Sequence, residues 1–113
     1  MPMTEADVRR IALSLPGVVE RASYGTPGWR VSDRLFARLH EEDGVLVARC
    51  ASEEEKRALV AASPDRFFTT AHYDGHPHVL VRLGAVDEAE LREVLTDAWR
   101  TRAPKRLVAE LDG

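Results

Sequence analysis

The chain has 113 residues, of which 44% are hydrophobic and 31% charged, and its formal net charge is −3. This length and composition predict a single domain over residues 1–113 with one hydrophobic core. The negative charge argues against nucleic-acid binding through an overall positive field, but it leaves room for local basic patches. One cysteine cannot form an intramolecular disulfide, and no apolar run approaches the ~20 residues of a membrane span. We therefore expect a soluble cytoplasmic protein.

The first element expected along the chain is a helix over about residues 4–15, where apolar residues recur at helical spacing. Thr4 is a candidate N-cap with Asp7 three residues later, and a proline–glycine pair ends the segment. Two short extended pieces, at about 18–24 and 28–32, then flank a turn rich in glycine and proline.

A β-hairpin is expected next. Residues 35–40 alternate in the manner of a strand, an Asp-Gly pair supplies the turn, and residues 45–50 return. The alternation predicts that Phe36 and Arg38 lie on the same face of the sheet. Ser52 then caps a short helix with acidic residues in its first turn, and a proline ends it.

The last part of the chain holds the longest expected helix. Residues 65–78 are expected to form a loop or an irregular strand, and 79–83 a regular strand. Asp87 caps a helix over 88–102, and 105–113 can add one or two helical turns. The residues of the long helix expected to face the core include Leu91, Leu95 and Trp99.

The expected order is therefore a helix, four strands, a helix, a strand and two helices. Consecutive strands joined by tight turns pair antiparallel. Helices grouped around such a run predict an α+β fold, in which an antiparallel sheet carries its helices on one face.

Four blocks of the sequence resemble the MmcQ/YjbR-like family: LSLPGVVERASYGTPGWRV, RLFARLHEEDGVLVARC, FFTTAHYDGHPHVLVRL and TDAWRTRAPKRLVAELD. They occur in the order of the family and cover nearly the whole chain. The resemblance implies a CyaY-like α+β domain and carries over no established enzymatic activity. Members are usually labelled DNA-binding proteins, by analogy with a double-wing arrangement of hairpins. The chain departs from many members at residues 74–78, which read Asp-Gly-His-Pro-His where they have Asn, Lys, His and Trp.

Five cations, three on the expected hairpins and two after the longest helix, are candidate contacts to DNA phosphates: Arg30, Arg34, Arg38, Lys105 and Arg106. Such contacts would position a duplex without reading its sequence. The alternative for the basic run over residues 100–106 is electrostatic, because cations near a helix C-terminus offset the negative end of the helix dipole. The pairs Arg9-Arg10 and Lys56-Arg57 are expected to lie on solvated helix faces.

The alternative function is that of a small-ligand or protein-interaction domain. Its pocket would lie between the 24–30 turn and the 68–78 loop, because functional residues gather on loops held by a rigid scaffold. The candidate lining residues are Tyr24, Trp29, Phe68, His72 and Tyr73. A competing interpretation of Trp29 is that it belongs to the core.

No metal, cofactor or reaction is expected from the sequence. Three histidines and an aspartate over residues 72–78 have the side chains of a metal site, but Pro77 and an Asp-Gly turn argue against a regular arrangement. The chain has no nucleophile elbow, P-loop, dinucleotide-binding glycine fingerprint or paired CxxC, so an enzyme is disfavoured. Cys50 is expected to be a small buried apolar group, and as a nucleophile it would need a histidine such as His40 or His72 beside it.

Overall fold

The structure, a computed structural model, describes residues 2–113. Its helices and strands in chain order are α1 (Glu5–Leu13), β1 (Val18–Glu20), β2 (Gly28–Val31), β3 (Arg34–Leu39), β4 (Val45–Arg49), α2 (Glu53–Ala62), β5 (Phe67–Phe68), β6 (His78–Arg82), α3 (Glu88–Arg100) and α4 (Lys105–Asp112). Each expected element is present. The segment for which a loop or an irregular strand was expected contains the two-residue strand β5 and a 3₁₀ turn at Ala71–Tyr73.

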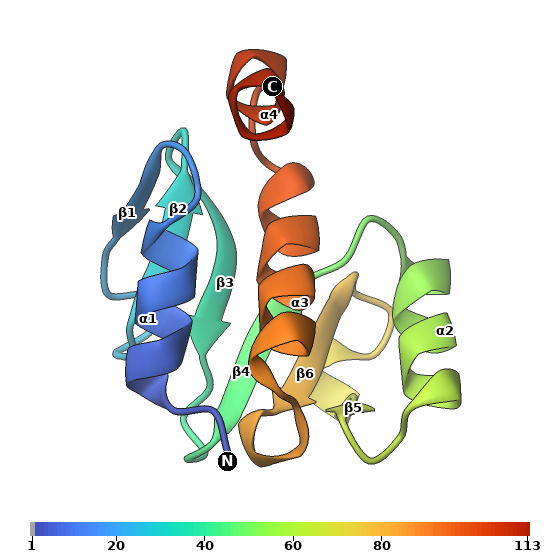
Figure 1. Cartoon of the computed structure of the whole chain (residues 1–113). Helices are drawn as coiled ribbons and strands as arrows, with labels where there is room; N and C mark the ends of the chain where they lie inside the picture. Colours follow the sequence, from blue (N-terminus) through green and yellow to red (C-terminus); the bar gives the residue numbers. More distant parts are fainter. Residues whose placement is uncertain (1) are drawn as a thin grey trace.

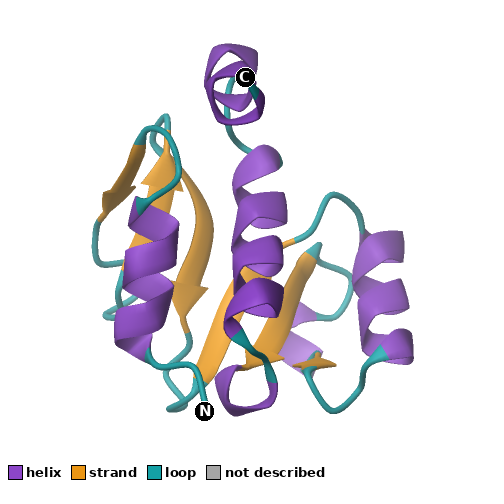
Figure 2. Ribbon diagram, in the orientation of Figure 1, coloured by secondary structure: helices purple, strands orange, loops and turns teal. Residues whose placement is uncertain are grey.

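The sheet has the strand order β1-β2-β3-β4-β6-β5, and every neighbouring pair is antiparallel. Figure 1 shows α1 and α3 side by side across one face of the sheet, α2 beside β5 and β6, and α4 beyond the end of α3. The same layers are distinguished by element type in Figure 2. The α+β fold with helices packed on an antiparallel sheet is therefore confirmed.

The main core lies between the sheet and the two helices α1 and α3. Leu91, Leu95 and Trp99 are fully buried, as their helical spacing predicts. Trp29 is fully buried as well, which agrees with its interpretation as a core residue. Both indoles keep a hydrogen bond, since Trp99 Nε1 donates to the carbonyl of Pro16 at 2.9 Å and Trp29 Nε1 donates to Glu20 Oε1 at 3.1 Å. The large rings thus fill the core without leaving a polar atom unsatisfied.

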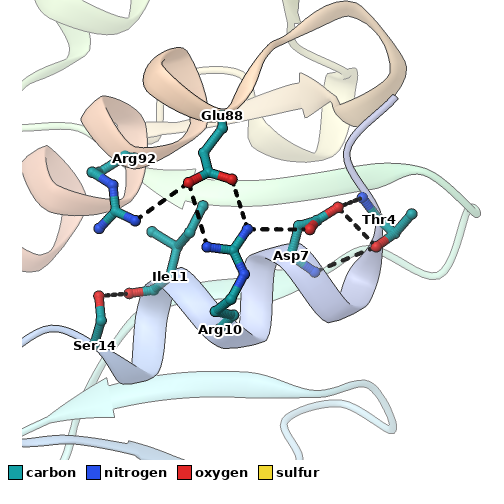
Figure 3. A network of polar contacts seen from close by, with 7 residues as sticks. All are labelled: Thr4, Asp7, Arg10, Ile11, Ser14, Glu88 and Arg92. Atoms are coloured by element: carbon teal, nitrogen blue, oxygen red, sulfur yellow. Dashed lines mark hydrogen bonds and ion pairs between the residues drawn. The ribbon is translucent and has the colours of Figure 1, made fainter. Parts of the chain in front are cut away.

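The helix starts are fixed by the caps that the sequence predicts, and polar contacts join α1 to α3 (Figure 3). Thr4 and Asp7 form a reciprocal capping box at α1, and Asp87 and Glu90 form another at α3. Arg10 extends from α1 to Glu88 at the start of α3, with Nη2 to Oε1 at 2.8 Å. Each cap satisfies backbone N–H groups that have no partner inside the helix, so both helices begin at a defined residue.

A β-bulge changes the alternation expected for β3. The pairing of β2 with β3 shifts register between Trp29 and Arg30. As a result Phe36 and Ala37, which are consecutive, both contribute to the main core. The prediction that Phe36 shares a face with Arg38 is therefore wrong, because a bulge places two residues of one strand opposite one residue of its partner.

The second face of the sheet is covered by the 3₁₀ turn rather than by a helix. The ring of Tyr73 packs there against Val45, Val47 and Leu80, and the half-buried Phe68 lies beside this cluster. The histidine-rich stretch after β5 therefore begins with a turn that closes the second face of the sheet, and Tyr73 is its main contact.

Lys56 holds this turn against α2. Its side chain is only 2% exposed, and its Nζ donates to the backbone carbonyls of Tyr73 and, at 2.9 Å, of His76. The expectation that Lys56 lies on a solvated helix face is wrong. The first turn of α2 packs against a loop from a later part of the chain, and the carbonyls of that loop take the ammonium in place of water.

Candidate functional site

Of the five residues expected to line a pocket, Tyr24 and Tyr73 contact a buried arginine, whereas Phe68 packs against Arg82. Arg38 Nη2 donates to the hydroxyl of Tyr73 at 2.6 Å, and the Arg38 guanidinium lies 5.2 Å from the centre of the Tyr24 ring. His72 is exposed with its ring edge-on to that of Tyr73, and Tyr24 is exposed as well. The 24–30 turn and the 68–78 loop are thus brought together, but Arg38 occupies the space between them, and Trp29 points into the core.

A larger hollow lies elsewhere, between α2 and α3. This α2–α3 groove has a volume of about 770 Å³, and its floor includes Ala48 and Val79 of the sheet and Cys50, which follows β4. Ala58 and Ala62 line it from α2. Sequence reasoning missed the groove. The available signal was the alanine-rich end of α2, because small side chains on facing elements leave space that larger ones would fill.

Of the five cations expected to contact DNA, Arg38 is the one that is buried. It is 8% exposed, and its guanidinium also donates to Glu41 at 3.1 Å and to the carbonyl of Leu39 at 3.1 Å. Arg38 is therefore not part of the exposed basic surface. Arg30 is half-buried and donates to the carbonyl of Asp33 at 3.3 Å, whereas Arg34 is exposed. Lys105 and Arg106 are exposed in the first turn of α4, which has no acidic residue and no side-chain cap.

Three arginines form a cluster at one end of the fold. Arg34 begins β3, Arg49 ends the antiparallel strand β4, and Arg102 follows α3, so the three lie at one end of the fold. Within residues 2–113 none of them forms an ion pair with a carboxylate. Arg102 belongs to the basic run already considered, but Arg49 was missed. Arg49 could have been found from its position at the end of a predicted strand, because the antiparallel neighbouring strand begins with Arg34.

The three charges act on one another and on a histidine. Burial, then the charges of Arg49 and Arg34, lower the pKa of Arg102 below its ordinary value. Its Nε is buried without a hydrogen-bond partner among the described residues. His78, which pairs with Arg49 across β4 and β6, has its pKa lowered from 6.5 to about 4 by burial and by the nearby cations, of which Arg49 has the largest effect. The cluster is therefore a local concentration of positive charge in a chain whose net charge is negative.

Such a cluster is suited to an oxyanion. Guanidinium groups present several donors in a plane and match the geometry of phosphate or carboxylate oxygens. Like charges brought together without a counter-ion repel each other, and an anion among them would remove that cost. The lowered pKa of His78 keeps its ring neutral at physiological pH, so the positive charge of the cluster comes from the arginines.

The lowered pKa of His78 predicts a loss of stability in mild acid. The unfolded chain takes up a proton as the pH falls through about 6.5, whereas folded His78 does so only near 4. The contribution of neutral His78 to the unfolding free energy is therefore fully present above pH 6.5, and it is lost as the pH falls toward 4. Because the His78 ring is only half-buried and solvent partly screens its charge, we expect it to account for about 1 kcal/mol of the unfolding free energy lost between pH 7 and pH 5.

Urea denaturation at both pH values, on the wild type and on His78→Asn, measures this contribution. The asparagine variant should lose that much less than the wild type between the two pH values. An unchanged pH dependence in His78→Asn would contradict the assignment.

The remaining candidates for chemistry are Cys50 and the histidine and acidic side chains. Cys50 is buried on the groove floor, where burial and the charge of Glu55 raise the pKa of its thiol to about 11. It is therefore protonated and unreactive at neutral pH. Among the described residues, the histidines, cysteine and acids form no group of three that could hold a metal ion. Over the same part of the chain, no helix has the length and apolar character needed to cross a membrane.

Comparisons with known proteins place this fold among uncharacterised relatives. A family model described as YjbR matches residues 13–101. The chain is 38% identical, over 119 aligned residues, to uncharacterised proteins of Mycobacterium tuberculosis and Mycobacterium bovis, and each alignment covers 90% of both chains. The crystal structure of a Deinococcus radiodurans protein with a DUF419 domain is similar in fold, with a TM-score of 0.71 at 23% identity. That match covers 85% of this chain and 75% of the Deinococcus chain.

Proposed function

The chain belongs to the YjbR family, whose model spans residues 13–101, and from this premise we propose that it is a binding domain whose arginine cluster contacts the phosphates of duplex DNA. The observation that carries the proposal is the convergence of Arg34, Arg49 and Arg102 without a carboxylate partner in the described chain. Most other arginines are neutralised in ion pairs, for example Arg10 with Glu88 and Arg100 with Asp112. A free set of cations is what backbone contact requires.

The start of α4 extends this surface. Lys105 and Arg106 follow Arg102 by a few residues, and they lie at a helix N-terminus, where the backbone dipole already favours an anion. Cations at that end of a helix are unfavourable unless a negative group lies nearby. Together with Arg30 on the β2–β3 hairpin, these residues supply a basic region at the end of the fold where α3 ends (Figure 1).

A small-ligand or protein-interaction function between the 24–30 turn and the 68–78 loop is the alternative. It has less support, because the Arg38 side chain fills that space and bonds to Tyr73. For either function we propose the cytoplasm as the location, since the single buried cysteine needs no oxidising compartment.

Fluorescence anisotropy with a labelled duplex, titrated at several salt concentrations, tests the DNA proposal. We expect binding that weakens steeply with salt. Each of Arg34→Gln, Arg49→Gln and Arg102→Gln should reduce the slope of log K against log salt by about one. Arg57→Gln is the matched control, because Arg57 is 74% exposed and pairs with Glu53 on α2, away from the cluster.

A second readout separates specific contact from general attraction. Sulfate held by the cluster would offset the charges of Arg49 and Arg102 and so raise the pKa of His78, which an NMR titration of the imidazole measures with and without sulfate. The proposal fails if Arg57→Gln changes the salt slope as much as the cluster variants do. It also fails if the duplex binds no better than an unstructured polyanion and the pKa of His78 does not respond.

A further inference from the structure

The α2–α3 groove is a second candidate site, and it shares only Arg49 with the arginine cluster. Its volume of about 770 Å³ falls within the range of about 300–1,000 Å³ that is typical of small-molecule sites. Toward β5 its walls are apolar, with Leu59 and Ala62 on α2, Phe67 on β5 and Val94 on α3. This end of the groove therefore suits a hydrocarbon or aromatic group.

The other end of the groove is acidic. Glu55 stands at the start of α2, and Glu93 and Asp97 lie one helical turn apart on α3. Within residues 2–113 none of the three forms an ion pair. The three acids line the same groove. Partial burial and the charges of Glu93 and Glu55 raise the pKa of Asp97, while the charge of Arg100 lowers it.

Two of the three arginines that line the groove are engaged in ion pairs, and the third, Arg49, lies beside His78 in the arginine cluster. Arg66 pairs with Glu90 near the apolar end, and Arg100 pairs with Asp112 of α4 at 2.6 Å. The acidic end thus keeps an excess of negative charge. Like charges at i and i+4 of a helix are destabilising, and a cation between them and Glu55 would reverse that contribution.

Because one end of the α2–α3 groove is acidic and the other is apolar, we propose that the groove binds a small organic cation with an apolar body, such as an alkyl or arylalkyl amine. The ammonium group lies between Glu55, Glu93 and Asp97, and the apolar body lies over Leu59, Phe67 and Val94. The groove has a charged end and an apolar end, which matches an amphipathic molecule and disfavours both an anion and a wholly apolar ligand.

A small molecule fits better than a helix of a partner protein. The acids are gathered at one end, whereas a basic amphipathic helix would require carboxylates spaced along the whole rim. The groove is also lined by small side chains, Ala48 and Cys50 on the floor and Ala58 on α2, so it admits a chain of atoms more readily than the ridge of a helix.

NMR chemical-shift mapping with three matched probes tests the inference. n-Octylamine should shift the amides of the groove residues and saturate below its micellar concentration. Octanol, which has the same body without the charge, should bind more weakly, and octanoate should bind least.

Two variants with matched controls locate the site. Asp97→Asn should reduce octylamine affinity by roughly two- to fivefold, as expected for a partly exposed ion pair. Glu54→Gln, which removes an exposed acid of α2 outside the groove, should leave the affinity unchanged. Ala58→Leu keeps the helix but fills the groove and should abolish binding, whereas Ala109→Leu on the exposed surface of α4 should not.

Three results would overturn the proposal. The first is that octanoate binds as tightly as octylamine, or that none of the three probes shifts the amide signals of the groove residues. The second is unaltered octylamine binding in Ala58→Leu, checked against its amide spectrum to establish that it is folded. The third is that groove shifts arise only with a basic Leu/Lys helical peptide, or only with rising protein concentration, which would assign the groove to a protein partner or to a second copy. None of these results bears on the DNA proposal.

Discussion

Replacing Lys56 with methionine is expected to lower the free energy of unfolding by about 2–3 kcal/mol, which is a large share of the stability of a small domain. Methionine keeps the apolar length of the stem but removes the ammonium. The carbonyls of Tyr73 and His76 then lose their donor while they stay covered by α2. A buried carbonyl without a donor costs more than the net value of the bond it has lost.

Chemical denaturation of Lys56→Met measures the global effect, and native-state hydrogen exchange measures where it begins. Protection should fall first over residues 69–77, because that loop loses its tie to α2 before the core opens. Arg57→Met is the control, since Arg57 is adjacent in sequence but 74% exposed, and it should change the unfolding free energy by less than about 0.5 kcal/mol. A neutral or stabilised Lys56→Met would mean that the loop finds other donors and that the lysine is not what holds it.

The helices and hairpins could be predicted because their signals are local. Within each capping box, Thr4 with Asp7 and Asp87 with Glu90, the two residues are only three positions apart in sequence. The periodicity of Leu91, Leu95 and Trp99 shows directly which face of α3 is buried. Antiparallel pairing followed from the short turns between consecutive strands. The resemblance to the family implies the same α+β fold as the order of the predicted elements.

The buried cations could not be predicted because their partners are distant. Lys56 meets Tyr73 across 17 residues, and Arg38 meets it across 35 residues. On a local pattern each resembles an ordinary surface charge, since lysine and arginine are seldom buried without a partner. Arg49 was missed for the same reason, because it meets Arg34 and Arg102 only once the start of β3 and the ends of β4 and α3 lie together.

The two buried cations hold Tyr73 from opposite sides, which gives the 3₁₀ turn its position. Lys56 binds the backbone carbonyl of Tyr73 from α2, and Arg38 binds its hydroxyl from β3. The ring between them covers Val47 and Leu80 on the second face of the sheet. The turn needs no helix of its own to cover that face, because one charged hydrogen bond holds the backbone of Tyr73 and another holds its hydroxyl.

The same geometry predicts a large effect for Arg38→Met. The change removes a guanidinium that is 8% exposed and leaves the Tyr73 hydroxyl and the Leu39 carbonyl without their donor. We expect a loss of about 2–3 kcal/mol in unfolding free energy. Tyr73→Phe should lose less, and the double variant should lose less than the sum, with a coupling of about 1 kcal/mol between the two side chains.

DNA titration of Arg38→Met, at a temperature where it remains folded, distinguishes the two roles that this residue can have. Because the guanidinium is enclosed by Thr26, Glu41 and Tyr73, it should reach no phosphate, and the salt slope should equal that of the wild type. A slope reduced by about one, with little change in stability, would instead make Arg38 a phosphate contact, as the strand pattern first predicts. Additive stability losses in the double variant would independently contradict its bond to Tyr73.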